Sequence, residues 1–554
     1  MLTVHFPLQG LSAVVPEGTA LVEAARTAGI RVESPCGGAG RCGKCKMKVS
    51  AEHQDNLVLT ALGPLSEDER RDGFVLACHA FVKGDLQAEF VAEEPASTNI
   101  LSSGKQVDTN LDTPICKIFL EDKNITQVRF DGLPKVEERG DTTGRCCGAA
   151  IDIGTTTLVA ALIDLNTGKE LGAASSLNPQ VVFGHDVLSR IRCAADPDGL
   201  MKLHDAIVRE LDRMLAVMAR RGRIEPAHIY ELVLSGNTCM LHLAAGVDPR
   251  SLGRYPYTPV LKGGECIAVR DVGFSLPDAA RVYFPPIISG FVGADITAGI
   301  IATGLHREPG IVLFIDIGTN GEMVLSMNGR LMATSTAAGP AFEGMNIACG
   351  MRAADGAVEK FSIGDDGRVS VGIIGGTKPA GICGSGLVDI VGEFVSHGVL
   401  DRNGRFSKNG RMPDLVRERM SFENGKPIFL ISDEVFLTQQ DIRQVQFAKG
   451  ALRSGIDILL DGNGLKYSDV DQVLIAGAFG FHLRTKNLVR IGILPGELEA
   501  KIDLVGNTSK TGARALLLDR SLRREALRIV DRVDVIELAN EPGFERTFIH
   551  NLAF

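Results

Sequence analysis

A short segment that occurs twice places the tightest limit on how this chain can fold. Residues 151–157 read Ile-Asp-Ile-Gly-Thr-Thr-Thr, and residues 315–321 read Ile-Asp-Ile-Gly-Thr-Asn-Gly. Each copy lies between two apolar runs, which predicts a β-hairpin closed by a Gly-Thr turn. Two such hairpins in one chain indicate an internal duplication, although two ordinary, unrelated hairpins would leave the same trace.

The segments that follow each hairpin repeat in the same order. They are a third strand (170–176 and 330–337), a long amphipathic helix (201–221 and 442–460), a glycine-ended strand (232–238 and 473–480) and a helix of small residues (293–299 and 506–513). Strands and helices in this order make one α/β domain. We therefore expect two similar α/β domains that face each other across a cleft.

The base of this cleft is expected to bind a polyphosphate. A Gly-Thr turn presents successive backbone N–H groups and hydroxyls to an anion. An aspartate precedes each turn, and two carboxylates can hold Mg²⁺ through its waters. The glycine-bracketed turn 477–480 would let a purine lie against the backbone. The residues predicted to bind nucleotide are Asp152, Gly154, Thr155, Thr156, Asp316, Gly318, Thr319, Asn320, Gly477 and Gly480, with Asp152 and Asp316 also holding magnesium.

Four cysteines near the N-terminus have the spacing of an iron–sulfur site. Cys36, Cys42 and Cys45 lie in one glycine-rich loop, and Cys78 follows 33 residues after Cys45. This C-x5-C-x2-C…C pattern resembles the C-x4-C-x2-C…C of plant-type [2Fe–2S] ferredoxins, and its longer first gap resembles the adrenodoxin-like branch. A zinc site or inert cysteines are the alternatives, but zinc prefers paired C-x2-C knuckles. We expect His79 to be an ordinary neighbour, because mixed ligation needs two histidines on one iron.

The elements around these cysteines follow the order of a β-grasp ferredoxin over residues 1–92. The expected elements are a hairpin (3–7 and 11–16), a helix (20–28), a strand (46–49), a helical turn (65–70) and a strand carrying Cys78 (74–81). Residues 93–147 read as a linker or small intermediate subdomain, with two possible strands at 115–120 and 126–130. A tether would let the cluster domain move, whereas a fixed connection would not.

Bulk composition excludes several other classes of protein. A net charge of −9 argues against a nucleic-acid partner. The chain has no apolar run of about 18 residues, and its first residues lack the features of a signal peptide, so a cytoplasmic location is expected. Cysteines rarely form disulfides there. We expect the adjacent Cys146 and Cys147 to be structural.

The duplicated part resembles the superfamily of acetate and sugar kinases, Hsp70 and actin. The resemblance implies a duplicated ribonuclease H-like ATPase, with subdomains over 148–308 and 309–554. Joined to the N-terminal ferredoxin-like domain, the whole chain resembles the ATP-dependent reductive activators of corrinoid proteins. That resemblance implies a [2Fe–2S] cluster, ATP and Mg²⁺ as cofactors. It also implies an ATP-dependent one-electron transfer that reduces inactive Co(II) to Co(I) in a corrinoid methyltransferase protein, a low-potential electron donor and a possible homodimer.

A carboxylate that positions water near the γ-phosphate is also expected. Glu322 and Glu343 are the candidates, and a structural role for either is the alternative. Three competing functions stay open. One is an ATP-driven electron donor to a dehydratase, whose cluster would use cysteines within the ATPase fold, here Cys349 and Cys383. The others are a small-molecule kinase with a redox module and a non-catalytic ATP-binding interaction protein.

Overall fold

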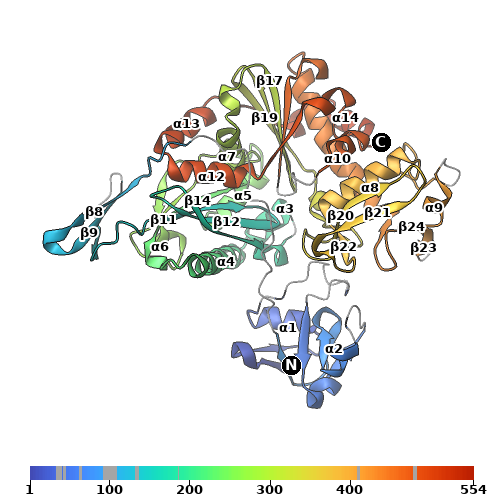
Figure 1. The fold of residues 1–554 in the computed structure, drawn as a ribbon, viewed down its shortest axis with the longest axis horizontal. Helices are drawn as coiled ribbons and strands as arrows, with labels where there is room; N and C mark the ends of the chain where they lie inside the picture. Colours follow the sequence, from blue (N-terminus) through green and yellow to red (C-terminus); the bar gives the residue numbers. More distant parts are fainter. Residues whose placement is uncertain are drawn as a thin grey trace. The chain divides into compact units, whose positions relative to one another are not determined.

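A computed structural model describes residues 1–30, 32, 40, 45–60, 65, 67–90, 109–130, 136–184, 186–407, 412–423, 425–477 and 483–554 (Figure 1). The chain divides into two compact units. One consists of Met1–Thr98 with Ala341–Val445, and the other of Asn99–Pro340 with Gln446–Phe554. No helix in the described ranges is long and apolar enough to cross a membrane.

The N-terminal domain is a mixed sheet covered by one main helix. Its strands are β1 (Leu2–Phe6), β2 (Leu11–Val15), β3 (Lys46–Val49), β5 (Phe74–Leu76) and β7 (Leu86–Glu89), with β4 (Leu57–Leu59) pairing with β6 (Ala80–Val82) and helices α1 (Leu21–Thr27) and α2 (Glu67–Arg71). The strand order is β2-β1-β7-β3-β5, with β1 antiparallel to β2 and parallel to β7. Alternate residues such as Val4 and Phe6 are buried against α1. The predicted β-grasp ferredoxin fold is confirmed.

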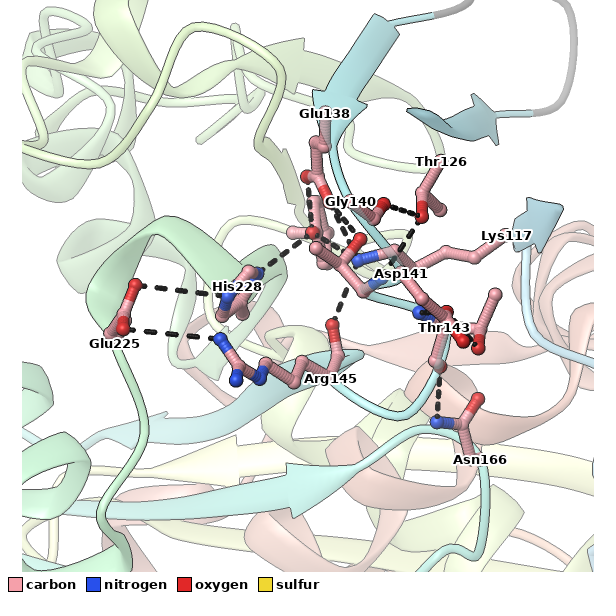
Figure 2. Close-up of polar contacts among 12 residues, drawn as sticks. Lys117, Thr126, Glu138, Gly140, Asp141, Thr143, Arg145, Asn166, Glu225 and His228 are labelled. Atoms are coloured by element: carbon pink, nitrogen blue, oxygen red, sulfur yellow. Dashed lines mark hydrogen bonds and ion pairs between the residues drawn. The ribbon is translucent and has the colours of Figure 1, made fainter. Parts of the chain in front are cut away.

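The described part of the connecting segment forms a small antiparallel sheet. It consists of β8 (Ile115–Leu120), β9 (Ile125–Phe130) and β10 (Val136–Arg139), in the order β10-β9-β8. The buried Lys117 ammonium donates hydrogen bonds to Glu138 Oε2 (2.8 Å), to the Tyr230 hydroxyl (2.7 Å) and to the Arg145 carbonyl (3.0 Å). Figure 2 shows how this cluster joins the small sheet to the domain that follows. Because Tyr230 belongs to the neighbouring sheet, the segment from Lys117 onward is fixed to that domain.

The first copy of the duplicated domain is a six-stranded sheet in the order β13-β12-β11-β14-β16-β15. Its strands are β11 (Cys147–Ile153), β12 (Thr157–Asp164), β13 (Glu170–Leu177), β14 (Ile229–Gly236), β15 (Cys266–Ala268) and β16 (Arg281–Tyr283). Its helices are α3 (Val187–Cys193), α4 (Pro197–Gly222), α5 (Thr238–Ala244), α6 (Val269–Val272) and α7 (Ala294–Thr303). β11 and β12 pair antiparallel, whereas β14 runs parallel to β11 after the crossover through α4.

The second copy repeats this topology in the order β27-β26-β17-β18-β19-β28. Its strands are β17 (Ile311–Ile317), β18 (Gly321–Met327), β19 (Arg330–Thr336), β26 (Gln472–Ala476), β27 (Ile502–Gly506) and β28 (Asp534–Ile536). Its helices are α10 (Gln439–Asp461), α11 (Thr485–Arg490), α12 (Thr508–Leu518), α13 (Arg520–Val530) and α14 (Phe544–His550). In both copies the third, second, first and fourth strands lie side by side in that order, so the predicted duplication is confirmed.

The two helices of small residues, α7 and α12, pack against each other between the sheets (Figure 1). A Cβ atom at Gly512 would lie 2.0 Å from the Ala298 carbonyl oxygen, so only glycine permits this approach. Phe314 of the second sheet and Val233 of the first belong to the same buried core around these helices. Small side chains therefore bring the two copies into one packed structure.

A further set of elements interrupts the second copy between β19 and α10. It consists of β20 (Ala357–Ile363), β21 (Val369–Ile373), β22 (Gly381–Ile382), α8 (Gly384–Ser396), α9 (Asp414–Arg417), β23 (Met420–Glu423), β24 (Lys426–Leu430) and β25 (Phe436–Thr438). Phe361, Phe394 and Phe429 form its core, with the rings of Phe394 and Phe429 centred 4.4 Å apart. The sequence pattern alone does not predict this insertion.

Candidate functional site

The turns of the two duplicated hairpins meet in the structure. The hydroxyl oxygens of Thr156 and Thr319 lie 3.4 Å apart, although the two residues are 163 positions apart in the chain. Both side chains are buried. Each turn is closed by its own backbone, since the amide of Gly154 donates to the Thr157 carbonyl and the amide of Gly318 to the Asn320 carbonyl, both at 3.0 Å. The two predicted phosphate-binding turns therefore face each other, as the duplication requires.

Asp152, at the end of β11, is held by side chains from the other copy. Asn507 Nδ2 donates to one carboxylate oxygen and Ser509 Oγ to the other, each at 2.8 Å. Asn507 also caps α12, because its Oδ1 accepts from the Lys510 amide at 2.8 Å. Ser509 Oγ lies 2.9 Å from the hydroxyl of Ser235 on β14. The orientation of a carboxylate in the first copy thus depends on the first turn of a helix in the second.

The neighbouring Thr155 is fixed in a similar way. Asn237 donates from Nδ2 to the Thr155 hydroxyl at 2.9 Å, while its Oδ1 accepts from the Met240 amide and caps α5. The Arg190 guanidinium donates to the Thr155 carbonyl at 2.6 Å and is itself fully buried. The first turn is therefore held rigidly before any ligand arrives.

Four carboxylates influence one another at this site. Burial, and then the charge of Asp152, raise the pKa of Asp295 to about 7. Burial, and then the charges of Asp295 and Asp316, raise the pKa of Glu322 well above its usual range. Glu322 is only 5% exposed. Carboxylates that raise one another's pKa favour a bound cation, because a cation relieves their repulsion.

The arrangement suits magnesium held through water. Among the described residues, no three acidic, histidine or cysteine side chains are placed to coordinate one metal ion directly. Mg²⁺ usually keeps several of its waters and takes only one or two carboxylates from the protein. Asp152 and Asp316, the two residues predicted to hold magnesium, each lie next to the last residue of their strand.

The glycine that follows β26 occupies a position where a side chain does not fit. Gly477 has φ of +127°, and a Cβ atom there would lie 2.5 Å from the Ile317 carbonyl oxygen. Gly236 occupies the corresponding place in the first copy, with a Cβ position 2.6 Å from the Ile153 carbonyl oxygen. The strand end therefore lies directly against the hairpin strand in both copies. Gly480 falls outside the described residues.

The two candidate water-positioning carboxylates differ in their placement. Glu322 lies on β18, paired with Asp316 on β17 across the hairpin. Glu343 belongs to the other compact unit, at the end of the turn Pro340–Glu343. The structure therefore places Glu322 beside Asp316, next to one of the predicted phosphate-binding turns.

Sequence reasoning missed six side chains of this site: Arg190, Ser235, Asn237, Asp295, Asn507 and Ser509. Asn237 and Asp295 each stand in the first turn or cap of a helix, which is a detectable local signal. Ser235 and Ser509 carry no such signal, since their role comes from a contact between parts of the chain 274 residues apart.

The iron–sulfur cysteines are described in part. The sulfur atoms of Cys45 and Cys78 lie 3.2 Å apart, both side chains are buried, and the Ala77 amide donates to the Cys45 carbonyl at 3.0 Å. A disulfide needs about 2.05 Å. Two cysteine side chains that face each other without a disulfide bond fit a pair of ligands to one iron. Cys36 and Cys42 fall outside the described residues.

Gly40, which lies between Cys36 and Cys42 in the sequence, packs closely against the His79 ring. Gly40 has φ of +71°, and a Cβ atom there would lie 2.6 Å from the ring of His79. The Nδ1 atom of the same ring lies 2.9 Å from the Thr60 hydroxyl oxygen. The His79 ring thus lies between Gly40 and Thr60.

Four cysteines outside the N-terminal domain are of interest because the sequence analysis singled them out. The Cys349 sulfur accepts from the Phe436 amide at 3.3 Å, and the Cys383 thiol donates to the Val358 carbonyl at 3.3 Å. Burial raises the pKa of the thiols of Cys146 and Cys147 to about 12 and about 11. Thiols that stay protonated are poor metal ligands. These contacts disfavour a second cluster at Cys349 and Cys383.

Comparisons with known proteins agree with this division of the chain. Family models match residues 8–83 as a "2Fe-2S iron-sulfur cluster binding domain", 147–308 as "RACo middle region" and 310–554 as "C-terminal domain of RACo the ASKHA domain". The chain is 30% identical to the corrinoid activation enzyme RamQ of Eubacterium limosum, over all of this chain and 99% of that relative. It is 25% identical to the [Co(II) methylated amine-specific corrinoid protein] reductase of Methanosarcina barkeri, over 74% of this chain and 77% of that one.

One solved structure matches the whole molecule. The "reductive activator for corrinoid,iron-sulfur protein" is 31% identical, with a TM-score of 0.75 over 100% of this chain and 98% of that one. An N-terminal iron–sulfur domain followed by a duplicated ATPase-type domain is therefore a shared architecture.

Proposed function

Because the chain belongs to the family of reductive activators of corrinoid proteins, we propose that it returns inactive Co(II) in a corrinoid protein to Co(I) at the expense of ATP. The observation that carries the proposal is the presence, in one chain, of two features. Cys45 and Cys78 face each other at 3.2 Å, and the two phosphate-binding turns meet at Thr156 and Thr319. The first feature serves one-electron transfer and the second serves nucleotide binding.

The cluster of this proposal is a [2Fe–2S] centre held by Cys36, Cys42, Cys45 and Cys78. When bound, it supplies single electrons to the corrinoid protein. The chain buries the sulfur atoms of Cys45 and Cys78 and so keeps water from them. Burial and hydrogen bonding around such sulfurs set the reduction potential.

The nucleotide of this proposal is Mg-ATP. The backbone and hydroxyls of 154–156 and 318–320 would bind its phosphates, and Gly477 with Gly480 would leave room for the purine. Asp152 and Asp316 would hold the magnesium waters. Glu322, buried beside Asp316, is our first choice for the residue that positions the attacking water, and Glu343 is the second.

Energy from ATP is needed because the Co(II)/Co(I) couple lies at very low potential, whereas a [2Fe–2S] centre is usually a weaker reductant. For one electron, about 30 mV corresponds to roughly 0.7 kcal/mol. ATP binding that changes how the corrinoid protein is held would alter the cobalt coordination and make the metal easier to reduce. A low-potential electron donor, a homodimer and a cytoplasmic location stay predictions.

ATP turnover tests this function against the alternatives. We expect the anaerobic protein to hydrolyse ATP slowly alone and faster when Co(II) corrinoid protein is added. Asp316→Ala should remove the stimulated rate. Lys123→Ala is the control and should keep it, because Lys123 lies in the exposed turn Glu121–Lys123 and is not one of the predicted nucleotide-binding residues. A small-molecule kinase would instead respond to a metabolite. Turnover that is indifferent to the corrinoid protein would overturn the proposal.

A further inference from the structure

A second cavity lies in the same compact unit as the nucleotide turns but shares no residue with them. Its volume is about 380 Å³, and it opens among the first turn of α13, the edge of the first sheet and the start of the small sheet. Its charged lining consists of four arginines and two carboxylates: Arg281, Arg520, Arg523, Arg524, Asp112 and Glu231. The chain as a whole has a net charge of −9. The lining therefore has a local excess of positive charge, which favours an anionic ligand.

Two of the arginines build the walls of this cavity. Arg523 donates to both oxygens of Glu231, at 2.8 and 2.7 Å, and its guanidinium lies 4.4 Å from the centre of the Tyr283 ring. Both members of this pair are almost fully buried. Arg520 donates to Asp112 at 2.5 Å. These two arginines are neutralised by their partners and keep the cavity open in a defined shape.

The other two arginines are not held by a carboxylate in this way. Arg281 donates to the carbonyl oxygens of Asp278 and Ala280, at 2.7 and 2.8 Å, and Arg524 interacts with Asp112 through its charge without an ion pair. Across the described part of the chain, neither Arg281 nor Arg524 forms an ion pair with a carboxylate. Two guanidinium groups therefore line the cavity without a carboxylate paired to them, and the four arginines of the lining outnumber its two carboxylates. Arginine is well suited to bind phosphate or carboxylate, because its planar fork donates two parallel hydrogen bonds.

One side of the cavity is apolar. Phe130 and Pro114 line it, and the Arg281 guanidinium lies 5.8 Å from the centre of the Phe130 ring. A cavity of this volume is within the range of small-molecule sites. The combination fits a ligand with two parts. A doubly charged anionic head would bind Arg281 and Arg524, and a flat body would pack against Phe130.

We propose that this cavity binds a small organic dianion, a phosphate monoester or a dicarboxylate, that carries an aromatic or other flat body. Asp112 and Pro114 belong to the segment that joins the ferredoxin-like domain to the ATPase part, and the Asp112 amide donates to the Leu518 carbonyl at 2.9 Å. Leu518 ends α12, and the amide of Arg520, the first residue of α13, donates to the Asp112 carbonyl at 3.0 Å. A ligand in the cavity would therefore strengthen the attachment of this segment to the junction of α12 and α13. The inference does not depend on the proposed reaction with corrinoid proteins.

Titration with phenyl phosphate and phthalate tests the proposal and distinguishes the two kinds of head group. Binding to the full-length holoprotein is followed by calorimetry, and for phenyl phosphate also by ³¹P NMR, with and without an excess of a magnesium complex of a non-hydrolysable ATP analogue. We expect at least one probe to bind whether or not the analogue is present, and benzyl alcohol, which lacks the charge, not to bind. Affinity should fall as salt is added, because the attraction is electrostatic.

Two conservative variants and a matched control locate the site. Arg281→Gln and Arg524→Gln should each weaken binding by about tenfold, since each loses a charge-assisted hydrogen bond. Arg528→Gln changes an exposed arginine one turn further along the same helix, outside the cavity, and should leave the affinity nearly unchanged. Failure of both probes to bind, displacement by the ATP analogue, or equal affinity in all three variants would overturn the proposal.

Discussion

Removing the buried ammonium of Lys117 should detach the small sheet from the ATPase part. The Lys117 side chain is 3% exposed and that of its partner Glu138 is 19% exposed. All three ammonium hydrogens are used, by Glu138, Tyr230 and the Arg145 carbonyl. Lys117→Met has a similar length, so the change mainly removes the charge and its hydrogen bonds.

The expected loss is large because Glu138 remains behind without its counter-ion. Breaking one partner of a buried pair typically costs about 3–5 kcal/mol. Tyr230 and Thr142 still donate to Glu138, which compensates in part, so we expect roughly 2–4 kcal/mol here. The double variant Lys117→Met/Glu138→Gln should lose less than the sum of the single changes, since no unpaired charge is left.

Hydrogen exchange measured by mass spectrometry is the suitable assay. It reports the opening free energy of β8 and β9 directly, whereas denaturation of a multidomain chain is not two-state. Lys123→Met, on an exposed turn of the same sheet, is the control and should change little. If Lys117→Met alters protection by less than about 0.5 kcal/mol, the typical change for a neutral surface position, the small sheet is not held by this cluster.

Three further predictions follow from single sites. Gly477→Ala places a Cβ atom 2.5 Å from a carbonyl oxygen and should abolish nucleotide binding by calorimetry while the iron–sulfur spectrum survives. Cys45→Ser should remove the visible absorption of the cluster, whereas Cys349→Ser and Cys383→Ser should retain it. Loss of the absorption in either of the latter two variants would show that the cluster is bound by cysteines of the ATPase fold. Burial alone would raise the pKa of Glu138, but hydrogen bonds from Lys117, Thr142 and Tyr230 hold it below the usual range. A carboxylate with a lowered pKa stabilises the fold above the unfolded pKa of about 4.3, and this stabilisation is lost as pH falls through the folded pKa. Exchange protection in β8 should therefore fall in that acid range in the native protein, but not in Glu138→Gln.

Much of the fold was predictable because its signals are local. The Gly-Thr turns, the Asp before each and the order of strands and helices after them all lie within short windows of sequence. The cysteine spacing gave the ferredoxin domain in the same way. These patterns record backbone requirements, such as the close approach at Gly477, that no other residue satisfies.

The parts that were not predicted depend on long-range contacts or on insertion. Asn507 and Ser509 contact Asp152 although they are 355 and 357 residues away from it in the sequence. No local sequence pattern around either residue predicts that contact. The elements between β19 and α10 interrupt the second copy without any counterpart in the first, so the repeat could not reveal them. The attachment of Lys117 to Tyr230 likewise joins a segment that reads as a linker to the strand of another domain.

The absorption spectrum of the corrinoid protein gives the most direct test of the central proposal. The reduced protein, Co(II) corrinoid protein and Mg-ATP are mixed without oxygen, and the band of Co(I) is followed with time. The account predicts that the band appears with ATP, stays absent without nucleotide, and is lost in both Cys42→Ser and Asp316→Ala. Equal formation of Co(I) with and without ATP would contradict it.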